Sequence, residues 1–158
     1  TMLEAGKPYN ISPTGPSLIR RLEHGIRNYG QDVRLDNNPY EVGLGFAVDL
    51  NQEADFVGKE SLTQIKKEGL KKKLVGIEFG TERMKGWNED YWPVIENDKQ
   101  IGQVTTAAYS PSLKKNIGYA MLPIERTEIG TKITILARGD ETGATVIKEP
   151  FVRGREKQ

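Results

Sequence analysis

The spacing of hydrophobic residues changes near residue 70, so the chain shows two kinds of pattern. Before residue 70, apolar residues recur at the three- and four-residue intervals of a helix face, as at Leu18, Leu22 and Ile26. After it, short apolar runs alternate with turn residues, which is typical of β-strands. We therefore expect helices mainly in the first part of the chain and strands in the second.

The clearest helix pattern in the first part covers residues 14–30. Pro16 lies near the first helical position, where its missing N–H group costs nothing, and Gly30 suits a C-terminal cap. The polar residues 31–38 follow, and they end before Pro39, which disfavours a helical conformation at the preceding residue. This stretch is predicted to be a loop.

One strand and one further helix are expected before residue 70. Apolar residues at every second position predict a strand over residues 40–50: Val42, Leu44, Phe46 and Val48. The second helix should begin after Gly58 and end at Gly69, with Leu62 and Ile65 facing inward.

The second part of the chain predicts a small antiparallel barrel. Six short strands are expected, at residues 74–79, 93–96, 100–106, 116–122, 131–137 and 144–148. Turn residues separate them. The predicted fold class is therefore α+β, with a helix- and strand-containing segment at 1–69, a six-stranded antiparallel β-barrel domain at 70–152, and a flexible tail at 153–158.

Composition excludes several classes of function. The 23 Lys and Arg residues against 22 Asp and Glu leave a net charge of +1, which lacks the basic excess typical of nucleic-acid binding. The absence of Cys excludes a thiolate nucleophile, and His24 alone cannot form a histidine metal site. No apolar run approaches the ~20 residues of a membrane span. We expect a cytoplasmic protein that binds neither metal, nucleic acid nor membrane.

Several short blocks form a more specific pattern. They are Arg21-Leu22-Glu23, Tyr29-Gly30-Gln31-Asp32, the blocks 37–44, 55–62 and 102–118, and Glu149-Pro150-Phe151. Together they resemble the folate-dependent aminomethyltransferase family. That family includes the glycine-cleavage T-protein, the dimethylsulfoniopropionate demethylases, and the folate domains of dimethylglycine and sarcosine oxidising enzymes. The resemblance covers nearly the whole chain.

The resemblance implies that this chain is the C-terminal part of a larger enzyme, because residues 3–9 resemble the end of a helix that lies partway through such proteins. In the family, folate lies in a central channel, and the catalytic aspartate and the pterin contacts come from the preceding part. The resemblance therefore implies tetrahydrofolate as cofactor, no catalytic residue in this chain, and a missing N-terminal portion that a partner chain could supply.

One family contact to folate is replaced here. Glycine-cleavage relatives have an arginine four residues before the arginine that matches Arg21, and this chain has Ser17 there. The amino-acid sequence of residues 16–23 and 37–41 is more similar to that of the demethylase branch, which also lacks that arginine. Arg20, one helical turn from Ser17, either reaches the same ligand or is a solvated helix arginine.

Two other residues are candidates for the folate tail. Tyr109, in a predicted loop between two strands, either contacts folate or packs as an ordinary tyrosine. Arg153 either approaches an anionic folate glutamate or belongs to a disordered basic end. The aromatic residues Trp87, Tyr91 and Trp92 either line a substrate mouth or cover the open end of the barrel.

The function that the resemblance implies is tetrahydrofolate-dependent transfer of a one-carbon group from a small methylated or aminomethylated donor. The basic run of Lys66, Lys67 and Lys71–73 either steers an acidic lipoyl carrier protein to the enzyme or serves solubility. The alternative function is a non-catalytic binding or assembly module that completes a folate enzyme supplied by another chain.

Overall fold

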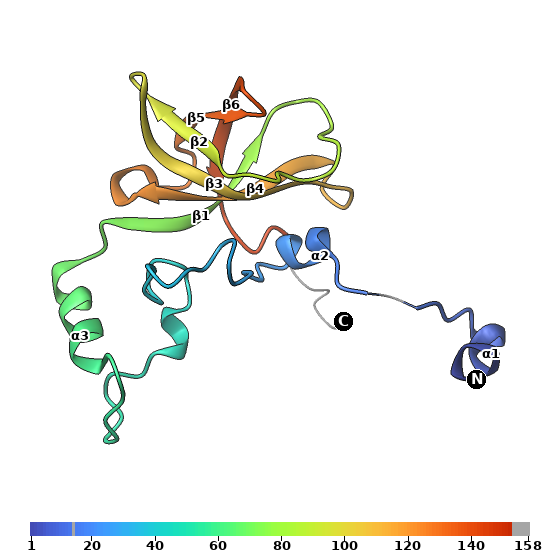
Figure 1. Ribbon diagram of the computed structural model, residues 1–158, viewed down its shortest axis with the longest axis horizontal. Helices are drawn as coiled ribbons and strands as arrows, with labels where there is room; N and C mark the ends of the chain where they lie inside the picture. The colour runs from blue at the N-terminus through green and yellow to red at the C-terminus, as the bar shows by residue number, and fades with distance from the viewer. Residues whose placement is uncertain (14, 153–158) are drawn as a thin grey trace.

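The computed structural model describes residues 1–13 and 15–152, and it has a β-barrel at one end and helices and irregular segments below it (Figure 1). The helices are α1 (Met2–Gly6), α2 (Leu18–Glu23) and α3 (Lys59–Glu68). Short 3-10 helices follow at η1 (Lys7–Tyr9), η2 (Gly45–Ala47) and η3 (Ile124–Arg126). The strands are β1 (Lys72–Phe79), β2 (Trp92–Glu96), β3 (Lys99–Ser110), β4 (Lys115–Pro123), β5 (Lys132–Ala137) and β6 (Asp140–Ile147).

The six strands form a closed barrel in the order β1-β4-β3-β2-β5-β6, and every pair of neighbours is antiparallel. The α+β fold class and the six-stranded antiparallel barrel are confirmed. Strand β3 is longer than expected and runs to Ser110, so Tyr109 lies within a strand and its placement in a loop was wrong. The division of the chain at residues 69 and 152 stays a prediction.

Both faces of the barrel wall are buried on the side where β1, β3 and β4 lie. The interior holds an apolar cluster of side chains from all six strands: Val75, Ile77, Phe79, Trp92, Val94, Val104, Ala107, Ala120, Leu122, Ile133, Ile135, Ala144 and Val146. Along β4 the alternate residues Ile117, Tyr119 and Met121 join a second cluster that includes Leu22 of α2. Because side chains of a strand point alternately to its two faces, the second cluster lies outside the barrel.

Helix α2 packs on this outer face and is shorter than predicted. It ends at Glu23 because Gly25, with φ of +77°, takes the left-handed conformation that commonly terminates a helix. Leu22 is fully buried against the barrel, whereas Ile26, beyond the end of the helix, is 58% exposed. The barrel of this same chain therefore covers the buried part of the apolar stripe of this helix. Residue 14, its predicted start, lies outside the described residues.

The strand predicted at residues 40–50 is absent from the described structure, which instead forms turns and η2 in this stretch. Every barrel strand already has two neighbours, so no sheet edge is left for another strand. Val42 is buried in the outer cluster, but Phe46 is 87% exposed. The period-two pattern therefore does not correspond to one buried face.

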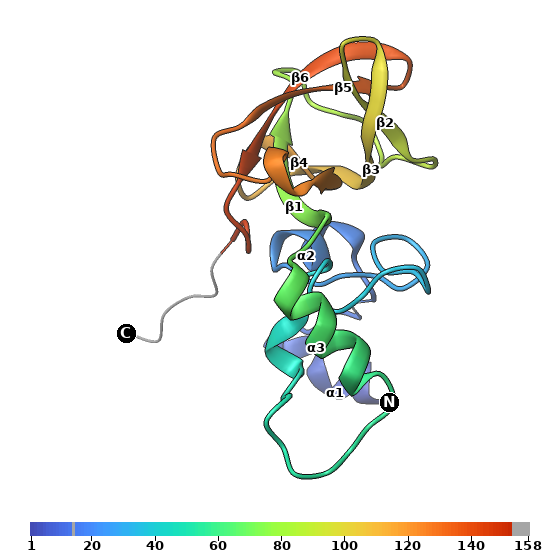
Figure 2. The ribbon, with the colours of Figure 1, turned by 90° about the vertical axis from the view of Figure 1, so that its left-hand side faces the viewer.

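Helix α3 is confirmed, with Gly58 as its N-cap and Gly69 as its C-cap. It leads into β1 and lies below the barrel, while α1 lies farther from the barrel (Figures 1 and 2). No helix formed by residues 1–13 or 15–152 combines the length and apolar character needed to cross a bilayer.

Candidate functional site

A pocket of about 300 Å³ lies between the start of α2, the end of β3 and the loop of residues 80–91. Its walls are formed by Ser17, Leu18, Ile19, Arg83, Met84, Gly86, Trp87, Ala108, Tyr109 and Pro111. Two residues that the sequence suggested for folate binding, Ser17 and Tyr109, thus line one pocket although they are far apart in the chain. We call it the α2–loop pocket.

A larger cavity of about 690 Å³ lies elsewhere on the barrel and is lined by residues such as Asp98, Lys132 and Glu141. Of the suggested folate-binding residues that the structure describes, Ser17, Arg20 and Tyr109, none lines this cavity. Its greater volume alone does not identify a ligand site, because ligand pockets are lined mainly by apolar and aromatic side chains with a few polar groups, and the α2–loop pocket has that kind of lining. The α2–loop pocket is therefore the stronger candidate.

Ser17 has a structural role as the N-cap of α2. Its Oγ accepts a hydrogen bond from the backbone N–H of Arg20 at 3.3 Å, and its backbone is extended, as N-cap residues usually are. The side chain of Arg20 is exposed, and Arg20 does not line the α2–loop pocket. The structure therefore brings Ser17, but not Arg20, together with Tyr109. Arg153 lies outside the described residues.

Tyr109 presents its ring to the guanidinium group of Arg83, whose central carbon is 4.7 Å from the ring centroid. Such a contact is attractive because the face of an aromatic ring carries partial negative charge. Trp87, 56% exposed, forms an isolated backbone bridge to Ala108 and lines the pocket beside the same strand end. The pocket therefore combines two aromatic side chains with one cation.

Two buried asparagines hold the loop that forms one wall of the pocket. The Asn116 Oδ1 accepts from the Met84 N–H at 2.9 Å, and its Nδ2 donates to the carbonyls of Phe79 and Glu82. The Asn88 Oδ1 accepts from the Ala107 N–H at 2.6 Å, and its Nδ2 donates to two further carbonyls. The loop is thus fixed to the barrel on both sides of Arg83.

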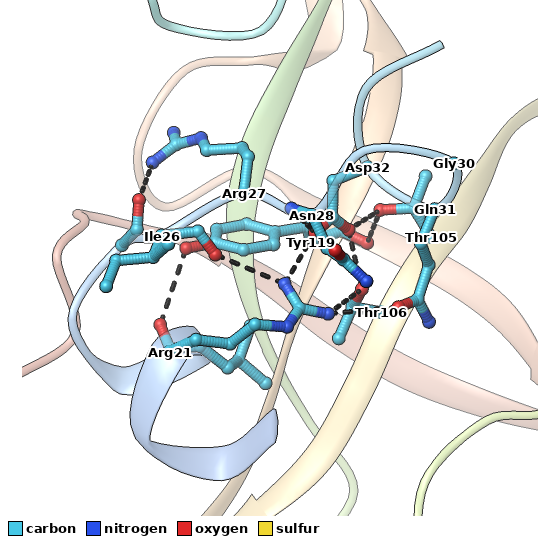
Figure 3. A network of polar contacts seen from close by, with 12 residues as sticks. Arg21, Ile26, Arg27, Asn28, Gly30, Gln31, Asp32, Thr105, Thr106 and Tyr119 are labelled. Atoms are coloured by element: carbon cyan, nitrogen blue, oxygen red, sulfur yellow. Dashed lines mark hydrogen bonds and ion pairs between the residues drawn. The ribbon is translucent and has the colours of Figure 1, made fainter. Parts of the chain in front are cut away.

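The opposite wall, α2, is held by a buried ion pair that Figure 3 shows. The Arg21 Nη1 lies 2.7 Å from Asp32 Oδ2, and Asp32 is 1% exposed. The other carboxylate oxygen of Asp32 accepts from the hydroxyls of Thr105 and Thr106 on β3. Arg21 also donates to the Thr106 hydroxyl at 3.2 Å. This network fixes the position of α2 on the barrel.

Glu23 provides a second link between α2 and the end of β3. Its Oε1 accepts a hydrogen bond from the Ser110 hydroxyl, and Ser110 follows Tyr109 directly in β3. The Ser110 Oγ in turn accepts from the Leu113 N–H, which closes the turn before β4. Both partners are buried, so α2 and the strand end that carries Tyr109 are held together.

The segment after β6 returns to α2 and closes the outer cluster. Val152 N–H donates to the Glu23 carbonyl at 2.8 Å, and the ring of Phe151 lies 5.6 Å from that of Tyr119. Glu149 forms an ion pair with Arg27, which also lies over the Tyr119 ring. The segment therefore stabilises the contact between α2 and the barrel.

Burial raises the pKa of two groups where the segment after β6 packs against Tyr119 and α2. Burial raises the pKa of Glu149 above its usual value, although the nearby positive charge of Arg27 acts in the opposite direction. Burial likewise raises the pKa of the Tyr119 hydroxyl, so that this group stays neutral. Its hydroxyl donates to the Leu22 carbonyl at 3.4 Å.

Arg83, Asn88 and Asn116 were not predicted from the sequence. Arg83 and Asn88 lie among turn and polar residues, and Asn116 begins a predicted strand, but the sequence contains no signal that separates a buried asparagine from an exposed one. Within the described residues, no group of three or more His, Cys, Asp or Glu side chains is placed to hold a metal ion. What the α2–loop pocket offers a ligand is therefore aromatic surface, apolar walls and the donors of Arg83.

Comparison with known proteins identifies the class to which this barrel belongs. Residues 72–153 match the family model described as the glycine cleavage T-protein C-terminal barrel domain. The chain therefore belongs to the glycine cleavage T-protein family, as the sequence resemblance implied.

Particular relatives agree with this assignment. The chain is 43% identical over 155 residues to an aminomethyltransferase of Geobacillus sp. (strain WCH70), covering 97% of this chain and 42% of the relative. It is 38% identical to the aminomethyltransferase of Bacillus subtilis (strain 168), covering 96% of this chain and 42% of the relative. The chain thus spans about two fifths of the length of these relatives.

A solved structure shows the same fold. The crystal structure of glycine cleavage system aminomethyltransferase T from Bartonella henselae superposes with a TM-score of 0.76 and is 26% identical in sequence. The match covers 85% of this chain and 37% of that chain.

Proposed function

We propose that this chain forms one wall of the tetrahydrofolate site in a one-carbon transferase of the glycine cleavage T-protein family. The observation that carries the proposal is that Ser17 and Tyr109 line one pocket beside the anchored helix α2. The names of the relatives, which are aminomethyltransferases, support the same reaction class. We expect the protein to act in the cytoplasm.

In this proposal, tetrahydrofolate accepts the one-carbon group at a reactive centre built by residues outside this chain. The part of the present residues is to bind and orient one end of the cofactor. A fixed orientation accelerates a reaction between two bound molecules because it removes most of the entropic cost of bringing them into line. The networks of Asp32, Asn88 and Asn116 support such a role, since they hold both walls of the pocket in place.

The donor in this proposal is a small methylated sulfonium or amine, or an aminomethyl group on a lipoyl carrier protein. Ser17, where glycine-cleavage relatives have arginine, favours the methylated donor. The names of the curated relatives favour the aminomethyl group. A binding assay with purified lipoyl carrier protein separates the two, because an enzyme that uses the carrier must recognise it and a demethylase need not.

The test of the proposed function is calorimetric titration of tetrahydrofolate into two proteins. One is the 158-residue chain, and the other is the same chain extended at its N-terminus by the segment that precedes it in the relatives. We expect high affinity only for the extended protein, because it adds the pterin site. Equal affinity in both proteins would contradict this placement of the pterin, and no binding by the extended protein would refute the proposed function.

A second candidate function is an assembly module that completes a folate enzyme supplied by another chain. Large apolar side chains that stay exposed in residues 1–69 favour it: Met2, Tyr9, Leu35, Phe46 and Val57. Gel filtration with mass spectrometry distinguishes the two, since a module should co-purify with its companion chain. A compact monomer that binds no companion would refute the idea of a module that needs one.

A further inference from the structure

The segment of residues 148–152, which we call the strap, leaves the barrel after β6 and returns to α2 (Figure 1). It meets the end of the helix through the Val152 N–H, which donates to the Glu23 carbonyl at 2.8 Å. Its Phe151 ring lies against Tyr119 of β4 and packs on the outer cluster. The strap therefore joins the barrel wall to the helix whose first turn forms part of the α2–loop pocket.

Two glycines leave room for the strap, one in the barrel wall and one just after the helix. The Cβ atom of an alanine at Gly76 of β1 would lie 2.8 Å from Cε1 and 3.0 Å from Cζ of the Phe151 ring. A Cβ atom at Gly25 would lie 3.3 Å from the Cβ atom of Pro150. The distances at Gly76 are shorter than carbon atoms in contact allow. The ring thus occupies the space that a side chain at position 76 would take, and we call this space the Gly76 notch.

The Phe151 ring is held between two strands of the barrel. Gly76 and Tyr119 are directly opposite each other in the β1–β4 ladder, so the notch opens on the outer face beside the Tyr119 ring. The centroids of the Phe151 and Tyr119 rings are 5.6 Å apart, within the favourable range for aromatic pairs. A ring that covers a strand glycine also compensates for the side chain that the glycine lacks.

The ion pair of the strap contributes less than a fully satisfied one would. Glu149 pairs with Arg27, but the Glu149 Oε2 and the Arg27 Nε are buried and form no hydrogen bond within residues 1–13 and 15–152. Each of these atoms offsets part of the gain of the pair, because it has lost its contact with water. Phe151 is therefore the main side-chain attachment of the strap.

The strap attaches α2 to a different part of the barrel than the two polar links do. Arg21 and Glu23 bond to hydroxyl groups of β3, whereas Phe151 contacts β1 and β4. The Tyr119 hydroxyl of β4 also reaches the Leu22 carbonyl, but at 3.4 Å this hydrogen bond is long. The six-residue helix is only about 9 Å long, so a small tilt about its β3 attachments moves its first turn. The strap restrains that tilt.

We propose that Phe151 is a positioning residue for the α2–loop pocket, although it does not line that pocket. With its ring in the Gly76 notch, the Val152 N–H holds the C-terminal end of α2, and Ser17 lies at the other end of the helix. Loss of the ring from the notch releases the C-terminal end, so Ser17 shifts relative to Tyr109. This inference rests on the proposed function, because the result of the shift is weaker binding of folate by that wall.

The test uses the N-terminally extended protein and measures amide hydrogen exchange without ligand and calorimetric binding of tetrahydrofolate. Gly76→Ala fills the notch, and Phe151→Leu removes the ring atoms without adding a clash. We expect each to speed exchange at the Val152 amide and to weaken tetrahydrofolate binding about threefold, as when α2 is correctly placed in about a third of the molecules. The matched control is Gly143→Ala in β6, where the added Cβ atom would meet no atom of residues 1–13 and 15–152 within 4 Å apart from its chain neighbours. It should change neither quantity.

The double variant Gly76→Ala with Phe151→Leu separates positioning from a general loss of stability. The alanine methyl group then fills space that the ring has left, so the double variant should bind tetrahydrofolate no more weakly than either single variant. Two independent effects would instead multiply to about ninefold. A purely structural role would lower the free energy of unfolding in urea but leave the affinity of the folded protein unchanged.

Failure of this inference is distinguishable from failure of the proposed function. Unchanged tetrahydrofolate affinity in both single variants, a ninefold loss in the double variant, or unchanged Val152 exchange in Gly76→Ala would overturn the role of Phe151 and leave the proposed function intact. No tetrahydrofolate binding by the unmodified extended protein would refute the proposed function. Faster Val152 exchange in Gly76→Ala but not in Gly143→Ala would then still support the strap as a restraint on α2, because exchange is measured without ligand.

Discussion

Arg21 and Asp32 form an ion pair at 2.7 Å that joins helix α2 to the outer face of the barrel. Asp32 is almost fully buried, and three further hydrogen bonds reach its carboxylate from the Asn28 N–H and from the hydroxyls of Thr105 and Thr106. A buried carboxylate is tolerated only when such partners replace water. The pair therefore determines where α2, and with it Ser17, lies relative to β3.

Removing Arg21 should destabilise the fold strongly. Arg21→Ala leaves Asp32 as a buried charge without its cation, which costs about 3–5 kcal/mol in comparable cases. Urea unfolding followed by circular dichroism measures the change in the free energy of unfolding. The control is Arg34→Ala, because Arg34 forms an exposed ion pair with Asp36 and should cost under about 1 kcal/mol. Similar losses in the two variants would show that the buried pair does not anchor α2.

The loop beside the pocket should loosen when Asn116 is replaced. Asn116→Ala leaves the Met84 N–H and two carbonyls without their partner, at a cost of about 1–3 kcal/mol. Hydrogen exchange at the Met84 amide should become faster. The control is Asn51→Ala, at an exposed loop position, which should change neither quantity. Unchanged Met84 exchange in Asn116→Ala would mean that the loop is held by other contacts.

Glu149 should make stability depend on pH in a particular direction. Burial raises the pKa of Glu149 in the folded chain, so its protonated form is favoured by folding. Its contribution is fully present below the pKa of the unfolded chain and is lost as pH rises through the raised folded value. Glu149→Gln does not titrate at this position.

The difference in the free energy of unfolding, unmodified chain minus Glu149→Gln, should therefore fall as pH rises from about 4 to about 7. Urea unfolding at several pH values measures it. A difference that rises over the same interval would show that the attraction of Arg27 outweighs the cost of burial.

Substitutions of Ser17 distinguish its effect on the helix cap from its effect on ligand binding in the pocket. Ser17→Ala removes the cap and should cost about 1 kcal/mol of stability. Ser17→Asp keeps a capping oxygen, so stability should be maintained, but it places a negative charge in the pocket wall. Binding of 4-aminobenzoyl-glutamate, the anionic part of folate without the pterin, should therefore weaken in Ser17→Asp through repulsion. Tighter binding in Ser17→Asp would mean that the occupant of the pocket is not an anion.

Much of the barrel was predictable from the sequence because its strands alternate and are separated by turn residues. The structure of residues 1–69 was less predictable, since the conformation of this segment depends more on tertiary contacts than on the local pattern of hydrophobic residues. Gly30 was predicted to end α2, whereas the helix ends at Glu23, and the packing of Leu22 and the link from Glu23 to Ser110 are compatible with this earlier end. The pattern at residues 40–50 predicted a strand, but a closed barrel offers no edge to pair with it.

The site was predictable only in part. Ser17 and Tyr109 were identified through the family resemblance, and the structure places both in one pocket. Arg83 was not identified, because it comes beside Tyr109 only in the folded chain. That contact does not depend on neighbours in the sequence, so only the folded arrangement shows it.

The central claim is that the α2–loop pocket is the surface this chain presents to folate. The most direct test is a map of backbone chemical-shift changes in the isotope-labelled chain titrated with 4-aminobenzoyl-glutamate. The account predicts that the largest changes fall at Ser17, Met84, Trp87 and Tyr109, which surround the pocket. Largest changes at Lys132, Thr134 and Glu141, which line the other cavity, or no changes at saturating ligand, would contradict it.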